Sequence, residues 1–465
     1  MAQTRFDLAV IGGGPAGYVA AARAARLGGK VALVERDGLG GTCLNRGCIP
    51  TKTLIHGASV LAAVSGAAAW GVSCGGRPVM DLAALLARKD QVVAGLAQGV
   101  SRLLAAAGVT VFSGLGQVPA PETVTVSGPG GQERLSARNI LLCLGARPTL
   151  PPIPGLDLPG VVTSDALLDA SDVPDTLAVI GGGVIGMEFA CLFASLGSAV
   201  TVIEAAERIL PMVDEELQKR LIPLWKRQGV TVVRGAAVSG IVPRGDMLAV
   251  RHAGRGGETE TVCRKVLAAV GRRPAPVDGI VALPGLVREG PFVAVDAGMR
   301  TSIPGVFAAG DLTPGPMLAH VASAEGMVAA ANAMGGNEEM DYEAIPACIY
   351  TVPEIAGVGL TEEQAAGRGL AVAVGRATYG ANGRAQTLGE PVGLVKLVAD
   401  AADGRILGAH LFGAQASELV AEAALAVRNR LTVRQLAATV HSHPSLSETL
   451  AEAARSLLGE QSHAA

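Results

Sequence analysis

Two cysteines near the N-terminus have the spacing of a redox pair. Cys43 and Cys48 lie in the segment GGTCLNRGCIPTK, and four residues separate them. Thiols this close can close a small ring, so the pair can alternate between a dithiol and a disulfide. Two buried structural cysteines are the alternative, since free cysteine packs as a small hydrophobe. An iron–sulfur pattern that also begins Cys-x4-Cys is excluded, because the next cysteine is Cys74.

A glycine-rich turn precedes this pair and has the form of a dinucleotide-binding fingerprint. The apolar run AVI leads into GGGPAG, and an alanine-rich, helix-forming stretch follows. Gly12 permits the tight turn, Gly14 lets a pyrophosphate approach, and Gly17 lets helix and strand pack closely. The N-terminus of the helix offers N–H groups to the phosphates. A second apolar run ends at Glu35, which is placed to bind a pair of ribose hydroxyls.

The same unit recurs later in the chain. The run AVIGGGVIG repeats the fingerprint with Gly181, Gly183 and Gly186, and the next apolar run ends at Glu204. The first glycine and the acidic residue are 23 residues apart in both copies. Because neither copy lacks a glycine or the acidic residue, the repeat predicts two dinucleotide sites rather than one site and a decayed copy. Two dinucleotides and a dithiol outline an electron path from a nicotinamide through a flavin to a disulfide.

The bulk properties indicate a multidomain enzyme. The 465 residues suffice for roughly three domains. A net charge of −3 gives no electrostatic reason to bind nucleic acid or an anionic membrane. Seven cysteines, an odd and scattered set, do not form a secreted disulfide framework. We expect the five outside the pair to be buried thiols suited to a reducing cytoplasm, namely Cys74, Cys143, Cys191, Cys263 and Cys348.

Two segments bear on membrane insertion. The chain reaches Asp7 before any long apolar stretch, so we expect no signal peptide. Residues 53–76 carry no Asp, Glu, Lys or Arg and are long enough to cross a bilayer. They contain few Leu, Ile or Phe, however, and we therefore expect a buried helix packed on the cofactor.

The remaining pattern divides the chain. Strands and helices are predicted to alternate to about residue 145, and the proline-rich residues 148–155 indicate an extended linker. The strand in GVFAAGD ends at Asp311, which is placed to bind hydroxyls of a sugar or ribityl chain, although turn aspartates are often simply solvated. From about residue 341 strand-like runs are followed by predicted helices over 418–429 and 432–438, which marks a separate domain.

These motifs resemble those of the flavin-dependent pyridine-nucleotide disulfide oxidoreductases over essentially the full length. The supporting runs are GGTCLNRGCIPTK, AVIGGGPAG, AVIGGGVIGMEFA, GVFAAGDL, MLAHVASAEG, YTVPEIAGVG and HSHPSLSE. Within the family, the chain is most similar to members that oxidise dihydrolipoyl groups. The resemblance implies an α/β fold with two Rossmann-like dinucleotide-binding domains and a C-terminal α+β dimerisation domain. The implied domains are an FAD domain at 1–147, an NAD domain at 148–272, a central domain at 273–340 that completes the FAD site, and the dimerisation domain at 341–465.

The resemblance also implies which residues bind the cofactors, FAD at the first fingerprint and NAD at the second. Asp311 is the expected partner of the ribityl chain. At Cys143-Leu144-Gly145 the chain departs from the Ala-Thr-Gly usual in the family, so one hydroxyl contact to FAD is missing. The predicted cofactor contacts are Gly12, Gly14, Gly17, Glu35, Gly41, Thr42, Lys52, Gly116, Gly145, Asp311, Met317, Leu318, Ala319, His320, Gly181, Gly183, Gly186, Glu204, Val238 and Gly271.

Two charged residues are predicted to act together at the flavin. Lys52 lies four residues after Cys48, and Glu188 lies two residues after the last glycine of the second fingerprint. If the cofactors meet face to face, the two charges can meet there and steady the negative charge that develops on reduction. Two solvated surface charges, which would contribute little, are the alternative.

His443 is the predicted base. Only a thiolate attacks a disulfide, so a substrate dithiol needs a base that works near neutral pH. Glu448 follows five residues later and can accept the second ring N–H. The resemblance places this His-Pro histidine across the dimer interface from the cysteine pair. His441 is the alternative base, and a metal site at the two histidines is disfavoured because no further ligand cluster accompanies them.

The predicted function is FAD-dependent oxidation of protein-bound dihydrolipoyl groups to lipoyl, with reduction of NAD⁺, by a cytoplasmic homodimer that binds neither nucleic acid nor membranes. NAD is preferred to NADP because the Glu204 carboxylate repels a 2′-phosphate, and Ala205 and Ala206 follow where NADP-preferring relatives have arginines. Arg208 is the first cation after them. The partner would be a lipoyl carrier: a 2-oxoacid dehydrogenase E2, a glycine cleavage H protein or a stand-alone lipoyl protein.

Three alternatives stay open. A glutathione-type reductase would share the cysteine pair but use NADPH. A mercuric reductase usually ends in a further cysteine pair, and the tail LLGEQSHAA has none. A non-catalytic subunit that binds lipoyl carriers would predict a broken redox pair, whereas both cysteines are intact.

Overall fold

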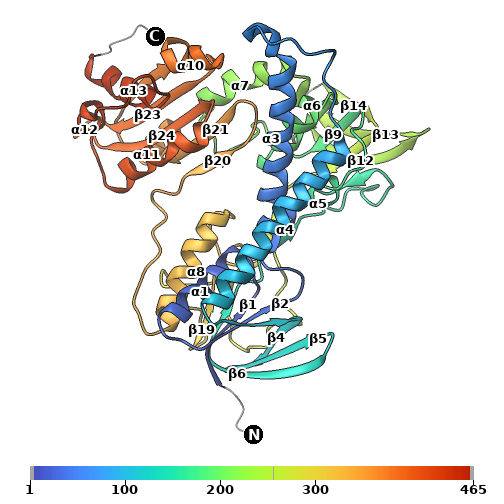
Figure 1. Ribbon diagram of the computed structural model, residues 1–465, viewed down its shortest axis with the longest axis vertical. Helices are drawn as coiled ribbons and strands as arrows, with labels where there is room; N and C mark the ends of the chain where they lie inside the picture. The colour runs from blue at the N-terminus through green and yellow to red at the C-terminus, as the bar shows by residue number, and fades with distance from the viewer. Residues whose placement is uncertain (1–4, 255, 461–465) are drawn as a thin grey trace. The chain divides into compact units, whose positions relative to one another are not determined.

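The computed structural model describes residues 5–254 and 256–460 and consists of two compact units (Figure 1). One unit combines the N-terminal residues with residues from the middle of the chain. The other combines the segment that contains the second fingerprint with the C-terminal residues. The domain boundaries predicted above stay predictions. The first unit comprises the residues up to Thr149, Thr163–Asp172 and Gly271–Asp341; the second comprises Leu150–Val162, Val173–Val270 and the residues from Tyr342 onward.

The first unit is built on a seven-stranded sheet. In spatial order its strands are β3 (Thr110–Ser113), β2 (Val31–Glu35), β1 (Arg5–Ile11), β6 (Gly131–Leu142), β5 (Thr123–Gly128) and β4 (Leu115–Ala120), and β19 (Val306–Ala308) also pairs with β6. β1 pairs in parallel with β2 and β6. β4, β5 and β6 are antiparallel, so the alternation of strands and helices expected up to residue 145 ends after β3.

The central strand β1 explains why this sheet is buried on both faces. Leu8 and Val10 belong to one hydrophobic cluster, and Ala9 and Ile11 belong to another on the opposite face. A continuous apolar run is what a parallel strand covered on both sides requires. On the first face, α1 (Pro15–Arg26) and α8 (Ala319–Ala333) pack side by side (Figure 1).

The helices that follow the first two strands are less buried than predicted for residues 53–76. α2 (Gly41–Arg46) and α3 (Cys48–Ser65) are followed by the short η1 (Ala67–Trp70), and α3 packs beside α4 (Leu82–Ala106). The segment 53–76 was expected to be a buried helix, yet Val64 is 39% exposed and Trp70 is 61% exposed. Alanine and serine dominate this half of α3, so it has few large side chains to bury. Cys74, also expected to be buried, is exposed in the loop that follows.

None of the helices within residues 5–254 and 256–460 combines the length and the apolar character that a membrane span requires.

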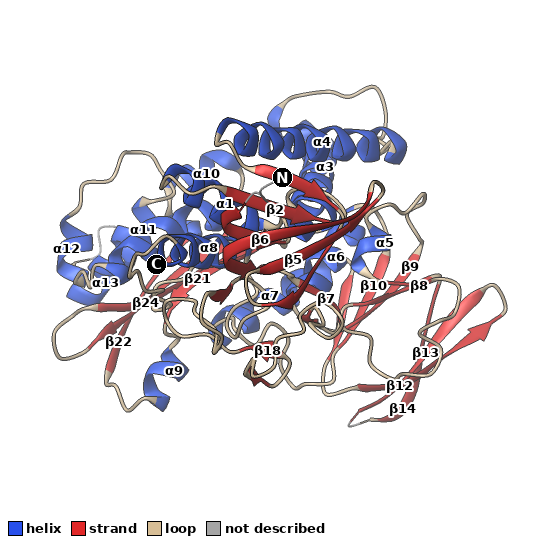
Figure 2. Cartoon of the chain, turned by 90° about the horizontal axis from the view of Figure 1, so that it is seen from below, coloured by secondary structure: helices blue, strands red, loops and turns tan. Residues whose placement is uncertain are grey.

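The second unit repeats the topology of the first. In spatial order its parallel sheet contains β11 (Val230–Val233), β10 (Ala199–Ile203), β9 (Thr176–Ile180), β15 (Lys265–Ala268) and β8 (Val161–Val162). β9 pairs in parallel with β10 and β15, as β1 does with β2 and β6. The helices α6 (Val184–Ser195) and α7 (Glu215–Arg227) follow β9 and β10. β12 (Ala237–Arg244), β13 (Met247–Gly254) and β14 (Gly257–Cys263) form an antiparallel sheet of their own (Figure 2).

The C-terminal residues of the second unit form an antiparallel sheet with helices. Its strands in spatial order are β20 (Ala347–Ile349), β21 (Glu354–Gly359), β24 (Ile406–Gly413), β23 (Leu394–Asp400) and β22 (Val372–Thr378). The helices are α9 (Glu362–Gly367), α10 (Gly383–Leu388), α11 (Ala416–Arg428), α12 (Val433–Ala438) and α13 (Glu448–Leu458). The predicted change to strands and then helices is confirmed, with α11 and α12 within two residues of their predicted bounds. The predicted fold class is also confirmed.

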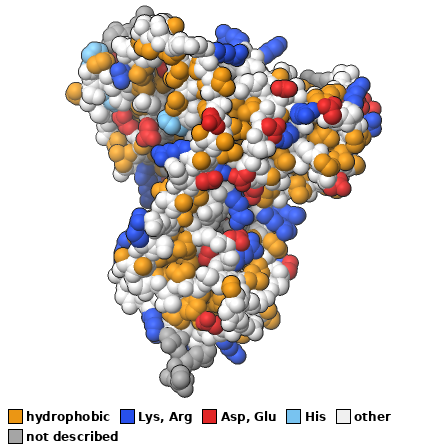
Figure 3. Space-filling view, turned by 45° about the vertical axis from the view of Figure 1, so that its right-hand side comes forward, with side chains coloured by type: hydrophobic (Ala, Val, Ile, Leu, Met, Phe, Trp, Pro, Cys, Tyr) orange, Lys and Arg blue, Asp and Glu red, His pale blue; other side chains and the backbone are white. Residues whose placement is uncertain are grey.

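Both signs of charge occur on the surface that Figure 3 shows. Lys and Arg side chains are interspersed there with Asp and Glu side chains. This distribution agrees with the near balance of 38 basic and 41 acidic residues in the sequence.

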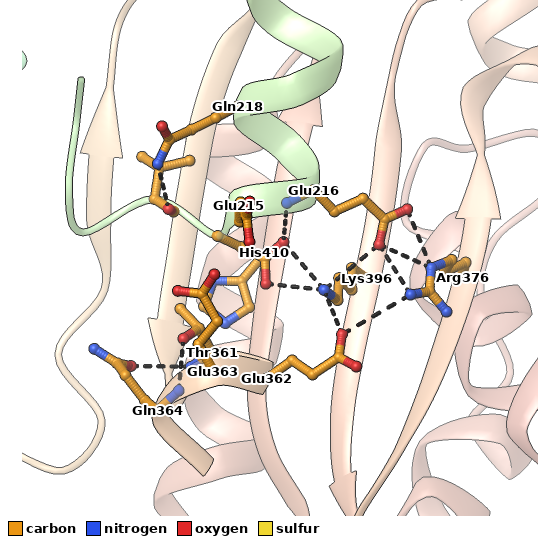
Figure 4. Close-up of polar contacts among 12 residues, drawn as sticks. Glu215, Glu216, Gln218, Thr361, Glu362, Glu363, Gln364, Arg376, Lys396 and His410 are labelled. Carbon is orange, nitrogen blue, oxygen red and sulfur yellow. Dashed lines mark hydrogen bonds and ion pairs between the residues drawn. The ribbon is translucent and has the colours of Figure 1, made fainter. Parts of the chain in front are cut away.

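A buried ion-pair network joins α7 to the C-terminal sheet (Figure 4). Lys396 on β23 is 2% exposed, and its Nζ lies 2.9 Å from Asp214 Oδ2, 2.8 Å from Glu362 Oε2 and 3.5 Å from Glu216 Oε2. Burial alone would lower the pKa of Lys396, but hydrogen bonds to Glu362 and Asp214 raise it above its ordinary value. Asp214 also caps α7, because its Oδ1 accepts the Glu216 N–H. The network therefore fixes the start of α7 on the C-terminal sheet.

Loss of one partner from this network should destabilise the second unit. Lys396→Met leaves the buried Asp214 carboxylate uncompensated, so we expect the free energy of unfolding to fall by about 3 kcal/mol. Urea unfolding can be followed by the fluorescence of Trp225, which is fully buried in α7. The matched control is Arg244→Met, which breaks an exposed pair with Glu260 and should cost less than about 1 kcal/mol. Equal losses in the two variants would contradict the assignment.

Candidate active site

Both fingerprint turns have the geometry that the glycine spacing predicts. Gly12 and Gly181 have φ angles of 105° and 106°, in the region that favours glycine. A Cβ at Gly17 would overlap the Gly12 carbonyl oxygen, and one at Gly186 would overlap that of Gly181. The helices α1 and α6 therefore start directly against the ends of β1 and β9.

The middle glycine of each turn leaves room for a ligand. A Cβ at Gly183 would have no described atom within 4 Å, and one at Gly14 would be 3.8 Å from the nearest, Gly41 Cα. Gly14 and Gly183 are the N-cap residues of α1 and α6, and no side chain caps either helix. An open space over uncapped N–H groups suits a pyrophosphate.

The acidic residues at the ends of the second strands are held alike in the two units. Glu35 Oε2 accepts the Gly13 N–H at 2.6 Å and its Oε1 accepts the Asp37 N–H at 2.8 Å. Glu204 accepts the Gly182 N–H and the Ala206 N–H, both at 2.7 Å. Each carboxylate is thereby fixed beside its glycine turn, where a ribose would lie.

The cysteine segment packs directly on the first fingerprint. The Gly40 N–H donates to the Gly13 carbonyl oxygen at 2.8 Å. Gly41 has a φ of 59°, and a Cβ there would lie 2.6 Å from Gly14 Cα. Side chains at these positions would push the segment away from the turn. Because α2 begins at Gly41, the close approach brings Cys43 to the mouth of the first nucleotide site.

The two cysteines interact with each other. Cys43 lies on α2, and Cys48 is the first residue of α3. The hydrogen bond between the Cys43 thiol and the Cys48 side chain, together with burial, raises the pKa of Cys43, while the charge of Lys52 acts in the opposite direction. The two cysteine side chains therefore interact, and Lys52, one turn along α3, reduces the rise in the pKa of Cys43.

Asp311 lies just after β19, the strand that pairs with β6 of the same sheet. Burial raises the pKa of its carboxyl, and the nearby Arg272 reduces the increase. The turn that carries it is held by Glu325 of α8, which is 2% exposed. Glu325 Oε2 accepts the Gly310 N–H at 2.7 Å and the Thr313 hydroxyl at 3.3 Å.

The other predicted cofactor residues occupy varied positions. Met317 and Leu318 precede α8, and Ala319 and His320 form its first turn, so backbone N–H groups cluster there. Thr42 follows Gly41 in α2. Gly145 and Gly271 follow β6 and β15 with positive φ angles of 69° and 106°.

Two further predicted residues lie on strands, and the stretch that departs from the family pattern follows a strand. Gly116 on β4 is buried, and a Cβ there would lie 3.0 Å from both Ile11 and Val34. Val238 lies on β12, opposite His252 of β13. In the stretch that departs from the family pattern, Cys143 is buried and its carbonyl oxygen abuts Gly12, so this residue packs on the turn through its backbone.

Lys52 and Glu188 belong to different compact units, and their predicted pairing stays a prediction. Glu188 lies on α6 and is 3% exposed. Its Oε1 accepts the backbone N–H of Tyr350 at 2.9 Å. A segment of the C-terminal domain therefore fixes this carboxylate, a contact that the sequence pattern did not predict.

His443 and Glu448 lie together at the start of α13. His443 Nδ1 donates to Glu448 Oε1 at 2.9 Å, and Glu448 Oε2 accepts the Ser445 N–H at 2.8 Å. The His443 side chain is 76% exposed. With Nδ1 engaged by the carboxylate, Nε2 carries the lone pair of the neutral ring.

His441 is held differently. Its Nδ1 lies 2.9 Å from the Thr439 carbonyl oxygen, and its Nε2 lies 2.8 Å from Glu422 Oε1. Carbonyl and carboxylate oxygens both accept, so both hydrogen bonds form only when each ring nitrogen carries a proton. In this state the ring has no lone pair with which to take a further proton.

The chain contains two dinucleotide-binding units, and a thiol pair packs on the fingerprint of the first. These features define a class of proteins that exchange electrons between dinucleotides and a disulfide. Comparison with known proteins agrees. Residues 6–326 match the family model described as pyridine nucleotide-disulphide oxidoreductase, and residues 345–454 match the dimerisation domain of the same family.

Individual relatives span nearly the whole chain. The chain is 42% identical to the dihydrolipoyl dehydrogenase of Thermus scotoductus over 463 residues, 98% of each chain. It is 39% identical to that of Chlamydia muridarum over 452 residues, 97% of this chain and 96% of the relative. Among solved structures, LpdA from Mycobacterium tuberculosis has a TM-score of 0.88, and the flavoprotein disulfide reductase RclA from Escherichia coli has 0.87. Both are 29% identical and cover 97% of this chain and 99% of their own.

The chain belongs to the pyridine nucleotide-disulphide oxidoreductase family. It is accordingly an oxidoreductase and a flavoprotein with FAD and NAD as its dinucleotides, and its dimerisation domain makes it a homodimer. The open spaces at Gly14 and Gly183 fit two dinucleotides. The resemblance stated from the sequence is thereby confirmed.

Glu325, Tyr350 and Glu422 are the site residues that sequence reasoning missed. Glu325 accepts the Gly310 N–H next to Asp311, the Tyr350 N–H donates to Glu188, and Glu422 contacts His441. The available signal was weak. An acidic residue amid the apolar side chains of MLAHVASAEG could have identified Glu325 as a buried, hydrogen-bonded carboxylate.

Removal of the Glu325 carboxylate should weaken FAD binding. Glu325→Ala leaves the Gly310 N–H without its acceptor, and the Thr313 hydroxyl keeps only the Gly310 carbonyl oxygen at 2.9 Å, so the turn that carries Asp311 loosens. We expect the dissociation constant of FAD, measured by flavin fluorescence, to rise about tenfold. Glu325→Gln keeps one acceptor oxygen, so its dissociation constant for FAD should lie between those of the wild type and Glu325→Ala. The control Ser323→Ala removes a hydroxyl that bonds to a carbonyl of its own helix, and a rise as large in this control would refute the assignment.

Proposed function

We propose that the protein oxidises protein-bound dihydrolipoyl groups to lipoyl and reduces NAD⁺ to NADH through Cys43 and Cys48. The observation that carries the proposal is the hydrogen-bonded cysteine pair packed on the first fingerprint turn. Relatives that are 39–42% identical over nearly the full length are dihydrolipoyl dehydrogenases, which supports the choice of substrate. RclA, at 29% identity, shares the fold but is a different flavoprotein disulfide reductase.

The thiol chemistry follows from the order of the two cysteines. A substrate thiolate attacks Cys43 of the Cys43–Cys48 disulfide, and the bond breaks with Cys48 as the leaving thiolate. The second substrate thiol, deprotonated in turn, attacks the substrate sulfur of the mixed disulfide and releases Cys43. The cyclic lipoyl disulfide departs, and its two electrons remain on the cysteine pair.

The glycine turns and their acidic residues would hold the two dinucleotides. Gly14 and the N-terminus of α1 would face the pyrophosphate of FAD, and Glu35 and Asp311 its hydroxyls. Gly183 and Glu204 would do the same for NAD. When bound, FAD would supply a two-electron acceptor beside the cysteine pair, and NAD⁺ would supply the final hydride acceptor.

His443 is the base that this chemistry needs. Its Nδ1 is engaged by Glu448, which fixes the tautomer and leaves Nε2 to take the proton of a substrate thiol. His441, the alternative base, has an acceptor at each ring nitrogen and would have to give up one hydrogen bond. We therefore assign His441 and Glu422 to positioning the loop that carries His443.

Lys52 and Glu188 are proposed to steady charge near the flavin. Lys52 already favours the thiolate form of Cys43. Glu188 is buried and is oriented by the Tyr350 N–H. Burial strengthens the interaction of such a carboxylate with a nearby cation.

The second fingerprint is proposed to discriminate against NADP through Glu204. The Glu204 carboxylate is held beside the second fingerprint by the Gly182 and Ala206 N–H groups. In that position it can accept hydrogen bonds from both ribose hydroxyls. A 2′-phosphate would meet the fixed carboxylate at close range and be repelled.

The proposed partner is a lipoyl carrier: a 2-oxoacid dehydrogenase E2, a glycine cleavage H protein or a stand-alone lipoyl protein. The cytosol is the proposed compartment, because buried thiols such as Cys191 and Cys263 suit reducing conditions. Burial raises the pKa of these two thiols to about 12 and about 11, which keeps them protonated and inert. Steady-state assays with free dihydrolipoamide and with each purified carrier would identify the partner.

The first test of this function uses Cys48→Ser. The variant cannot form the disulfide, so NAD⁺-dependent oxidation of dihydrolipoamide should fall by more than about a thousandfold. The protein should remain yellow with bound FAD, because Cys48 is not among its proposed binding residues. Retention of dihydrolipoamide turnover, or loss of FAD with the redox chemistry intact, would overturn the assignment. Cys74→Ser, which alters an exposed cysteine outside the pair, is the control.

A second test asks whether the site is shared between subunits. Cys43→Ser and His443→Gln are each expected to be inactive. If His443 of one subunit serves Cys43 of the other, a heterodimer of the two variants has one working site of two. Random exchange of equal amounts should restore about a quarter of the wild-type activity. Heterodimers that are shown to form by native mass spectrometry and yet stay inactive would contradict a shared site.

A further inference from the structure

A cation lies close to the ribose-binding residue of the second fingerprint. Arg208 follows Glu204 by four residues, in the loop between β10 and α7. The next residues pack on the fingerprint itself: the Leu210 N–H donates to the Gly182 carbonyl oxygen at 2.9 Å, and Ile209 abuts Gly182. Rossmann sites that accept NADP use an arginine near the acidic position to bind the 2′-phosphate. Arg208 is therefore in a stretch of chain where it can serve that purpose.

The guanidinium of Arg208 is engaged by other groups. Its Nη1 donates to Glu363 Oε2 at 2.8 Å, and its Nη2 donates to the Val213 carbonyl oxygen at 3.2 Å. Glu363 lies in the first turn of α9, in the C-terminal domain (Figure 4). That helix is anchored by a reciprocal capping box between Thr361 and Gln364, so Glu363 is presented on a fixed element.

We propose that Glu363 is a specificity-determining residue of the nicotinamide site, although it lies in the C-terminal domain. It acts through Arg208: the ion pair withholds from the nucleotide the cation that a 2′-phosphate needs. Discrimination against NADP then has two parts, repulsion by Glu204 and the engagement of Arg208 by Glu363. The inference rests on the proposed function in one respect, namely that the second fingerprint binds the nicotinamide dinucleotide with its ribose at Glu204.

Two neighbouring charged residues could also influence binding of the 2′-phosphate, and the test has to distinguish them from Arg208 and Glu363. Arg234 follows β11 and is exposed, and the Gly235 N–H donates to the Ala206 carbonyl oxygen at 2.9 Å, so Arg234 is a second cation beside the loop. Glu215 on α7 lies beside Glu363 (Figure 4) and interacts with Arg208 electrostatically. Glu215 is therefore the carboxylate that can take over when Glu363 is removed.

The test compares two nucleotide fragments that differ only in the 2′-phosphate. Adenosine 5′-monophosphate and adenosine 2′,5′-bisphosphate are titrated calorimetrically into the FAD-loaded dimer, in which the first site is filled. In Glu363→Ala, the bisphosphate should bind about fivefold more tightly, because it no longer has to break the Arg208–Glu363 pair, and an exposed ion pair changes an equilibrium constant by at most about this factor. The affinity for the monophosphate should not change. The ratio of kcat/KM for NADP⁺ to that for NAD⁺ should rise by the same factor, through a lower KM for NADP⁺.

Double variants decide which cation is responsible. Glu363→Ala with Arg208→Ala should lose the gain in bisphosphate affinity, whereas Glu363→Ala with Arg234→Ala should keep it. Glu215→Ala with Glu363→Ala should show a gain at least as large as Glu363→Ala alone. A gain that persists without Arg208 would mean a general effect of charge and would overturn the proposal. No gain in either Glu363→Ala or the Glu215→Ala double variant would overturn it as well.

The outcome is independent of the lipoyl substrate. The titrations need no dithiol, so failure of dihydrolipoamide oxidation would refute the proposed function without affecting this test. Conversely, an unchanged affinity for the bisphosphate in a protein that oxidises dihydrolipoamide with NAD⁺ would refute only the role of Glu363.

Discussion

At the start of both nucleotide-binding units, a helix meets its strand so closely that only glycine fits. A Cβ at Gly17 or Gly186 would overlap the carbonyl oxygen of the first glycine in the same turn. This contact fixes where α1 and α6 begin, and with it the direction of their uncapped N–H groups. The cysteine segment depends on the same contact, because Gly41 packs on Gly14. The redox pair is thus placed by backbone packing, and the Asn45 side chain, which donates to the Leu39 and Gly41 carbonyl oxygens, holds the same segment.

The acidic residues of the two units illustrate preorganisation. A carboxylate has about four lone-pair positions, and the backbone N–H groups occupy one on each oxygen of Glu35 and of Glu204. The carboxylate is therefore oriented before a nucleotide arrives and still has acceptor capacity for two ribose hydroxyls. Little side-chain entropy remains to be lost on binding, which favours affinity. The same rigidity makes the carboxylate an effective barrier to a 2′-phosphate.

Local patterns predicted what backbone packing determines. The glycine spacing, the acidic ends of the second strands and the duplication all follow from steric rules that act within about 25 residues, and the structure has each of them. The His443–Glu448 contact was predictable for the same reason, since five residues separate the partners. The burial of residues 53–76 was predicted wrongly, because an uncharged composition does not by itself indicate which face of a helix is covered. Contacts such as Glu188 with Tyr350, which are 162 residues apart, join segments whose proximity depends on tertiary packing, and no local pattern encodes that.

Three long-range contacts connect the same two parts of the chain. In each of them, a C-terminal residue of the second unit contacts the nicotinamide-binding segment. The Tyr350 N–H orients Glu188 on α6, Lys396 fixes the start of α7, and Glu363 engages Arg208 in the loop between β10 and α7. The helix that follows the fingerprint, the next helix and the ribose loop are thus all fixed to the domain through which the protein dimerises.

Such an arrangement has a physical consequence for the dimer. The three contacts connect the nicotinamide-binding residues to the C-terminal part of the second unit, which also contains α13, the helix that follows His443. The buried Lys396 pair is the contact best able to resist separation of these parts, since separating it would leave uncompensated charge in a low-dielectric environment. Dimerisation and nucleotide binding therefore rest on one framework, and a substitution that loosens it should disturb both.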